Sequence, residues 1–164
     1  SPGSYEDLMS QTQELLKFVL EDSASWPRFK YQEANMDEHG DPHVERDRFF
    51  VTHYPTEQAA LANISSDGGF AERFEAFADG FELCNGFSEL IDSTEQRKRF
   101  EKEQEDRRGL GKTVFPIDEE LLNALDGVRS PVYGNALGVD RLVMLKYGVK
   151  DINDTQLFPY AKSK

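Results

Sequence analysis

Glycines and an arginine at short spacing mark the segment most suited to chemistry, Gly134-Asn135-Ala136-Leu137-Gly138-Val139-Asp140-Arg141, which an apolar run follows at once. Small residues at alternate positions let a backbone lie close to a flat ligand, because glycine tolerates close approach. The pattern predicts a helix that carries Arg141 in its first turn. A helix amino terminus attracts anions, and a guanidinium suits phosphate. We therefore expect a phosphate-binding turn, although most turns of this kind only join a strand to a helix.

A second segment, residues 73–90, has the pattern of a hairpin that carries two glutamates. Asp79-Gly80 lies between two apolar, aromatic-rich runs, which is a strong signal for a two-residue turn. A regular ladder from that turn predicts four cross-strand pairs: Ala78 with Phe81, Phe77 with Glu82, Ala76 with Leu83, and Glu75 with Cys84.

In this register Glu75, Phe77, Glu82 and Cys84 share one face, because strand side chains alternate between faces. Glu75 and Glu82 become diagonal neighbours, about 7–8 Å apart along the backbone. Two such carboxylates repel each other unless a positive charge lies between them. Mg²⁺ is commonly bound by one or two carboxylates together with substrate phosphates. The pattern fits a Mg²⁺ site and, equally well, two glutamates on a solvated face.

Together these segments resemble class II aminoacyl-tRNA synthetases of the lysine branch, and best the lysyl-tRNA-synthetase-like ligases that attach lysine to elongation factor P. Residues 134–141 resemble motif 3 of the family, and residues 82–90 resemble its lysine-pocket segment. The resemblance covers the chain from about Phe49 onward and closes with Leu157-Phe158-Pro159. It implies an α+β fold, an antiparallel sheet flanked by helices.

The resemblance implies ATP and Mg²⁺ as cofactors and a catalytic role for Arg141. The family residue that matches Arg141 contacts the γ-phosphate of ATP. Those that match Glu75 and Glu82 lie at the ATP–metal site, and those that match Ala76 and Gly138 lie at the ATP.

The implied amino-acid pocket comprises Glu82, Asn85, Glu89 and Ala136. Glu89 would pair with the ε-ammonium of lysine, because a buried ammonium is costly without a carboxylate partner. Lysyl-tRNA synthetases usually have glycine at the position of Ala136, whereas the elongation-factor-P ligases resemble this chain in having alanine. Ala136 therefore favours the protein-modifying branch.

The implied reaction is ATP-dependent activation of lysine to lysyl-adenylate, followed by transfer to a lysine of elongation factor P; the choice between α- and β-lysine stays open. Nothing in the chain matches motif 1, the family's dimer interface, or motif 2, whose arginine holds the α-phosphate. We therefore expect the C-terminal half of a catalytic domain, with a homodimer only in the intact family protein. The alternatives are a lysyl-tRNA synthetase fragment that acylates tRNA, and a non-catalytic remnant that binds a nucleotide or a partner protein.

Composition sets further limits. The 164 residues include 31 acidic and 19 basic ones, for a net charge of −12, which argues against tRNA binding by this chain. The single cysteine, Cys84, excludes an internal disulfide and predicts a reducing, cytoplasmic location. No apolar run approaches the roughly 20 residues that a membrane span needs.

We expect two regions: residues 1–48, an N-terminal helix and a polar connection, and residues 49–164, the C-terminal part of the catalytic domain. Ser4 is the predicted N-cap of the first helix, and the polar connection covers residues 24–47. The apolar stripe of that helix should pack in the core: Leu8, Leu15, Leu16, Val19 and Leu20. A further helix is predicted after Asp92, its N-cap, and another opens with Pro116-Ile117-Asp118 and runs through Leu125. Gly148 is the predicted C-cap of the motif 3 helix.

Overall fold

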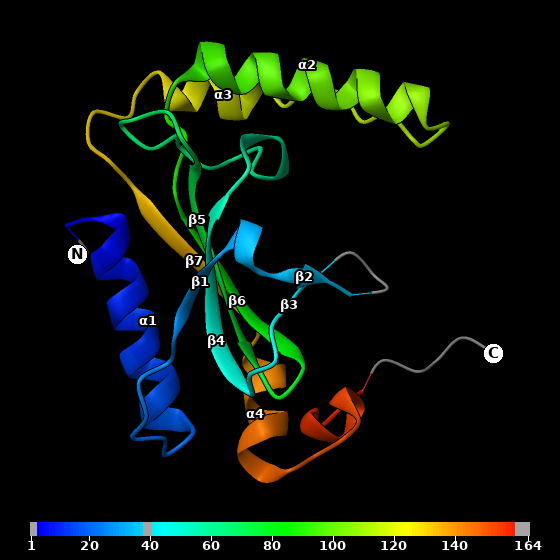
Figure 1. The fold of residues 1–164 in the computed structure, drawn as a ribbon. Coiled ribbons are helices and arrows are strands. Elements are labelled where there is room, and N and C mark those ends of the chain that lie inside the picture. Colours follow the sequence, from blue (N-terminus) through cyan, green and yellow to red (C-terminus); the bar gives the residue numbers. More distant parts are fainter. Residues whose placement is uncertain (1–2, 38–40, 160–164) are drawn as a thin grey trace.

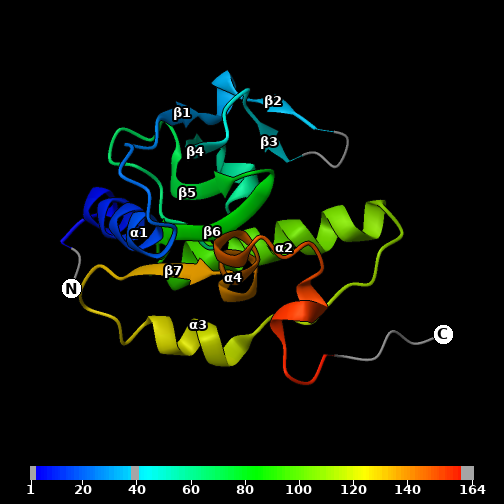
Figure 2. The ribbon, with the colours of Figure 1, turned by 90° about the horizontal axis from the view of Figure 1, so that it is seen from below.

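The computed structural model describes residues 3–37 and 41–159, and its centre is a five-stranded sheet (Figure 1). Figure 2 shows the strands in their order across the sheet, β1-β4-β5-β6-β7. Their bounds are β1 (Arg28–Lys30), β4 (Arg48–Tyr54), β5 (Ala71–Ala78), β6 (Phe81–Ser88) and β7 (Tyr133–Leu137). The α+β fold predicted from the sequence is confirmed, but the sheet is mixed, because β1 runs parallel to β4 while the other neighbours are antiparallel.

The described residues form four α-helices: α1 (Tyr5–Val19), α2 (Ser93–Gly109), α3 (Glu119–Leu125) and α4 (Val139–Tyr147). Helices α1 and α4 pack on β6, and α1 also packs on β7, whereas α2 and α3 pair with each other beyond one end of the strands (Figure 1). The short 3₁₀ helices are η1 (Tyr31–Glu33), η2 (Thr56–Gln58) and η3 (Ile152–Thr155). No helix in the described ranges has both the length and the apolar character of a membrane span.

The helix ends follow the signals in the sequence. The side chains of Ser4, Asp92 and Asp118 accept hydrogen bonds from the backbone N–H groups three residues on, as N-caps do. Gly148 ends α4 in the left-handed conformation, with φ of 67°. Leu15 was expected in the core but is 45% exposed, because its neighbour Leu16 takes the inward position.

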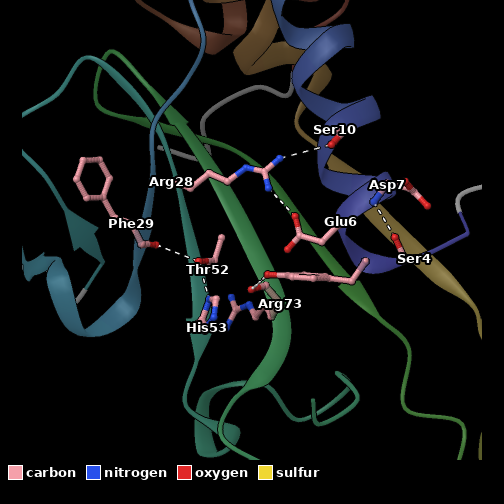
Figure 3. A network of polar contacts seen from close by, with 10 residues as sticks. Ser4, Glu6, Asp7, Ser10, Arg28, Phe29, Thr52, His53 and Arg73 are labelled. Carbon is pink, nitrogen blue, oxygen red and sulfur yellow. Dashed lines mark hydrogen bonds and ion pairs between the residues drawn. The ribbon is translucent and has the colours of Figure 1, made fainter. Parts of the chain in front are cut away.

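Residues 24–47, expected to be a polar connection, include β1, η1 and a separate two-stranded sheet of β2 (Asn35–Met36) and β3 (Pro42–His43). Arg28 on β1 reaches across to α1, where it donates hydrogen bonds to Glu6 and Ser10 (Figure 3). The segment before Phe49 therefore adds a strand to the main sheet and a helix to its core.

Two hydrophobic clusters cover opposite faces of the sheet. The first packs α1 and α4 against one face, with Leu16, Phe50, Phe74 and Leu142 among its buried members. The second lies on the other face, where Phe49, Val51, Tyr54 and Phe77 are buried. From Phe49 to Val51, β4 supplies alternate residues to the two clusters, with the period of two that strands require. An irregularity in the pairing between Thr52 and Tyr54 then places Tyr54 in the second cluster as well.

The β5–β6 hairpin has a β-bulge that the predicted register lacked. Asp79 and Gly80 form the turn as expected, with φ of 50° and 85°, and Phe77 lies opposite Glu82. Beyond that pair the ladder shifts by one residue, so that Ala76 lies opposite Cys84 and Glu75 opposite Asn85. The predicted pairs of Ala76 with Leu83 and of Glu75 with Cys84 are therefore wrong. Leu83 is the extra residue, and both Leu83 and Cys84 are buried in the cluster under α1.

Candidate ligand-binding site

The bulge brings four of the predicted site residues to one face of the sheet, the face opposite α1. Glu75, Asn85 and Ala136 lie side by side on adjacent strands, since Glu75 pairs with Asn85 and Asn85 with Ala136. Glu82 is on the same face, opposite Phe77 and diagonal to Glu75. Without the extra residue, Asn85 would point into the core and Cys84 would take its place. The bulge therefore decides which side chains form the site.

Glu75 is almost fully buried, with 6% of its surface exposed, and both of its carboxylate oxygens have partners. The Tyr54 hydroxyl donates a hydrogen bond of 2.5 Å to Oε2, and Arg73 forms an ion pair with Oε1. Burial and the charge of Glu75 raise the pKa of the Tyr54 hydroxyl, so Tyr54 remains a donor. These contacts hold the Glu75 carboxylate in a fixed orientation.

Glu82 is half-buried, and its carboxylate has fewer contacts. Burial, and secondly the negative charge of Glu75, raise the pKa of Glu82 above its ordinary value. Arg141 partly offsets this charge: its Nη1 donates a hydrogen bond of 2.6 Å to the Glu82 carbonyl oxygen and lies 3.7 Å from Oε2. A further cation between the two glutamates would relieve their repulsion.

The segment that resembles motif 3, residues 134–141, runs from strand β7 directly into helix α4. Gly138 is the N-cap of α4, and its N–H donates a hydrogen bond of 2.8 Å to the carbonyl oxygen of Leu83 in the bulge. Arg141 lies in the first turn of α4, as predicted, with 45% of its side chain exposed. The strand-to-helix turn thus presents a solvent-accessible guanidinium beside Glu82.

Ala76 lies elsewhere in the sheet. Its side chain is fully buried in the cluster under α1, on the face opposite Glu75. Among the residues that the resemblance assigns to ATP, it is the one whose side chain points into the core.

Glu89 follows β6 and lies against β7. Its carboxylate is so close to Gly134 that a Cβ atom at that position would stand 2.5 Å from Glu89 Oε1. Burial raises the pKa of Glu89, and within residues 3–37 and 41–159 its carboxylate has no hydrogen bond or ion pair. A half-buried carboxylate without a hydrogen-bond or ion-pair partner among the described residues is a suitable partner for an ammonium group.

Two hollows open on this side of the sheet. One is bordered by Arg73, Asn85 and Phe87 together with residues 58–62. The other is bordered by Glu82 and Arg141 with the stacked rings of Phe49 and Phe77, whose centroids are 5.1 Å apart. The predicted lysine-pocket residue Asn85 thus borders the first hollow, and the predicted phosphate residue Arg141 borders the second.

Sequence reasoning did not identify Arg73 and Tyr54 as members of this site. The signal for Arg73 was available, because it precedes Glu75 by two residues on a strand and therefore shares its face. Tyr54 comes from β4, and its approach to Glu75 depends on the β4–β5 register, which the sequence pattern did not predict.

A divalent cation would find two carboxylates here, those of Glu75 and Glu82. No group of three or more metal-binding side chains is present in the described part of the chain. Two carboxylates agree with a Mg²⁺ ion that takes its remaining ligands from phosphates and water. Both oxygens of Glu75 already have protein partners, so Glu82 offers the more open carboxylate to such an ion.

The family model for "tRNA synthetases class II (D, K and N)" matches residues 3–162. The chain belongs to this family. The match also includes residues 3–48, which the resemblance noted in the sequence did not cover.

Curated relatives are similar over about three quarters of the chain. An "Elongation factor P--(R)-beta-lysine ligase" from Proteus mirabilis is 48% identical over 121 residues, which are 73% of this chain and 37% of that protein. The protein of that name from Photorhabdus laumondii is 46% identical over 125 residues, 75% of this chain and 38% of the relative. The matched part is thus less than two fifths of either relative.

An experimental structure of a class II synthetase has the same fold. The aspartyl-tRNA synthetase from Entamoeba histolytica superposes with a TM-score of 0.73 at 15% sequence identity, covering 98% of this chain and 41% of that one. This likeness agrees with the class II catalytic fold predicted from motif 3.

Proposed function

We propose that this chain supplies part of the active site of an ATP-dependent ligase, which activates lysine as lysyl-adenylate and passes it to a lysine of elongation factor P. One observation carries the proposal: the bulge at Leu83 places Glu75, Glu82 and Asn85 on one face, beside Ala136 and near Arg141. Relatives named for the modification of elongation factor P with (R)-β-lysine support the choice of acceptor.

In this proposal Arg141 holds the terminal phosphate of ATP, because an exposed guanidinium in the first turn of a helix suits an anion. A Mg²⁺ ion held by Glu75 and Glu82 would neutralise phosphate charge as pyrophosphate departs. Glu82 has the more accessible carboxylate of the two, so it would make the more direct contact.

The amino acid would lie over Asn85 and Ala136, with its ε-ammonium at Glu89. The half-buried carboxylate of Glu89 would gain a charge partner, which stabilises both groups. The Ala136 side chain, exposed on β7 beside Asn85, would narrow the space for the lysine backbone. The Ala136 side chain would thereby discriminate between lysine isomers by their shape.

The test is lysine-dependent exchange of pyrophosphate into ATP by the full chain, with α-lysine and (R)-β-lysine compared. The Glu82→Gln variant is the matched control, because it keeps the shape of the side chain and removes its charge. Pyrophosphate exchange by the wild-type chain, together with its loss in the Glu82→Gln variant, supports the proposal. A preference for (R)-β-lysine supports the protein-modifying branch.

Binding is measured separately by calorimetry, because the chain spans only part of its relatives. If the chain binds lysine, and the Glu89 carboxylate is needed for that binding, an amino-acid site is supported even when no pyrophosphate exchange is seen. In that case the proposal is limited to half of an active site. A chain that neither exchanges pyrophosphate nor binds ATP or lysine contradicts the proposal and favours a partner-binding role.

A further inference from the structure

Arg73 contacts both halves of the candidate site. Its Nε donates a hydrogen bond of 3.0 Å to Asn85 Oδ1, and its Nη2 forms the ion pair with Glu75. Its Nη1 donates to the carbonyl oxygen of Gln58, and its guanidinium lies over the Tyr54 ring, 4.3 Å from the centroid. One side chain thus joins the residue assigned to the metal and the residue assigned to the amino acid.

The orientation of this guanidinium is strongly restricted. Tyr54 lies beneath it and also donates to the other oxygen of Glu75, so Tyr54, Arg73 and Glu75 form a closed set of contacts. The Arg73 side chain is 19% exposed, and the Tyr5 hydroxyl donates to its backbone carbonyl at 2.8 Å. An arginine fork held in this way directs its N–H groups along fixed lines.

The hydrogen-bonding capacity of Arg73 determines the orientation of the Asn85 amide. Arginine has no acceptor, so the Asn85 atom that faces Arg73 must be the oxygen. The Asn85 NH₂ group then faces away from Arg73, and it has no hydrogen bond to the described residues. Both of its hydrogens are available to a ligand.

We propose that Arg73 is a positioning residue that fixes the Asn85 amide, so that Asn85 offers hydrogen-bond donors to the bound amino acid. This rests on the proposed function in one respect, that the ligand is lysine. A donor next to a guanidinium attracts an acceptor such as a carboxylate and disfavours an ammonium. Lysine would therefore present its carboxylate end to Asn85 and its ε-ammonium to Glu89.

The first test does not depend on activity or on any ligand. Proton–nitrogen NMR of the wild-type chain should show the Arg73 Nε–H signal protected from solvent exchange, because it is hydrogen-bonded to Asn85. The Asn85→Ala variant should remove that protection, and Arg48→Lys should leave it unchanged. Arg48 is the matched control, since its ion pairs with Asp22 and Asp79 lie at the hairpin end of the sheet.

The second test is a double-mutant cycle for lysine binding measured by calorimetry. Arg73→Lys keeps the charge but loses the planar fork, and we expect it to raise the Kd for lysine about tenfold, the effect of one hydrogen bond to a charged group. In the Asn85→Ala background the same change should alter the Kd by less than about twofold, because Arg73 acts through Asn85. Arg48→Lys should lower the Tm without changing the Kd.

Lysinol, which has a hydroxymethyl group in place of the carboxylate, completes the cycle. Arg73→Lys should weaken lysine binding more than lysinol binding. Equal weakening of both ligands, or multiplicative effects of Arg73→Lys and Asn85→Ala, would overturn the proposal. If the wild-type chain binds no lysine, the proposed function fails, while the exchange protection of the Arg73 Nε–H still decides whether Arg73 orients Asn85.

Discussion

Glu89 lies over the backbone of Gly134, so closely that a Cβ atom at Gly134 would stand 2.5 Å from Glu89 Oε1. Real Cβ atoms do not approach an oxygen so closely, so any side chain there must displace the carboxylate. The φ of Gly134 is not in the left-handed region, so the backbone conformation does not itself require glycine. Glycine is required here because the Glu89 carboxylate lies so close to the backbone. The first glycine of motif 3 thus determines where the carboxylate of Glu89 can lie.

We predict that Gly134→Ala moves the Glu89 carboxylate and weakens lysine binding while the fold is retained. The Kd for lysine, measured by calorimetry, should rise roughly tenfold, since a charge-assisted contact is lost. Gly109→Ala is the control, because an added Cβ there has no neighbour within 4 Å. Unchanged lysine affinity in the Gly134→Ala variant would show that Glu89 does not contact the amino acid.

The ionised carboxylate of Glu82 should destabilise the folded chain. Burial and the charge of Glu75 raise its pKa, so its ionised form is less favourable in the folded chain than in the unfolded one. Glu82→Gln should therefore raise the Tm at pH 7, although under the proposed function it should abolish pyrophosphate exchange. The gain should decline as the pH falls below the raised pKa and disappear below the ordinary value of 4.5, where Glu82 is protonated in both the folded and the unfolded chain.

Thermal unfolding of both chains between neutral and acidic pH measures this difference. A Glu82→Gln variant that is less stable than the wild type at pH 7 would show that the ion pair with Arg141 outweighs the burial cost.

Asp22 should stabilise the fold above its pKa. Arg48, the backbone N–H of Ala24 and the Trp26 indole bind its carboxylate and lower its pKa to about 2. We expect Asp22→Asn to reduce the free energy of unfolding at pH 7 by roughly 1–3 kcal/mol.

Because the folded pKa is depressed, this contribution is complete above the ordinary value of 3.8 and declines as the pH falls toward about 2. Urea titrations across this interval test the prediction. A difference between the two chains that stays constant with pH would assign the effect to packing instead of charge.

Cys84 should report on opening of the β5–β6 hairpin. Its side chain is buried under α1, and burial raises the pKa of the thiol to about 12. Since the thiolate is the reactive form, a disulfide reagent should modify Cys84 only when the sheet opens. A Ser25→Cys variant places a second thiol at an exposed position and should react at once at that position. Immediate modification of Cys84 in the wild-type chain would contradict the buried register.

Local signals in the sequence determined much of the fold. Ser4, Asp92 and Asp118 cap helices, Asp79-Gly80 forms the hairpin turn, and Gly148 ends α4. Each of these is a contact within a few residues, so the amino acids involved suffice to predict it. The family follows from two separated motifs in the expected order, and the family match confirms it.

Tertiary structure alone decided which side chains meet. A regular ladder placed Cys84 beside Glu75, whereas the bulge at Leu83 places Asn85 there. Leu83 and Cys84 are both buried under α1, so packing between distant segments stabilises a register that alternation along the strand does not encode. The contact of Tyr54 with Glu75 likewise depends on strand pairing, because strand pattern shows the face of a residue but not its neighbour across the sheet.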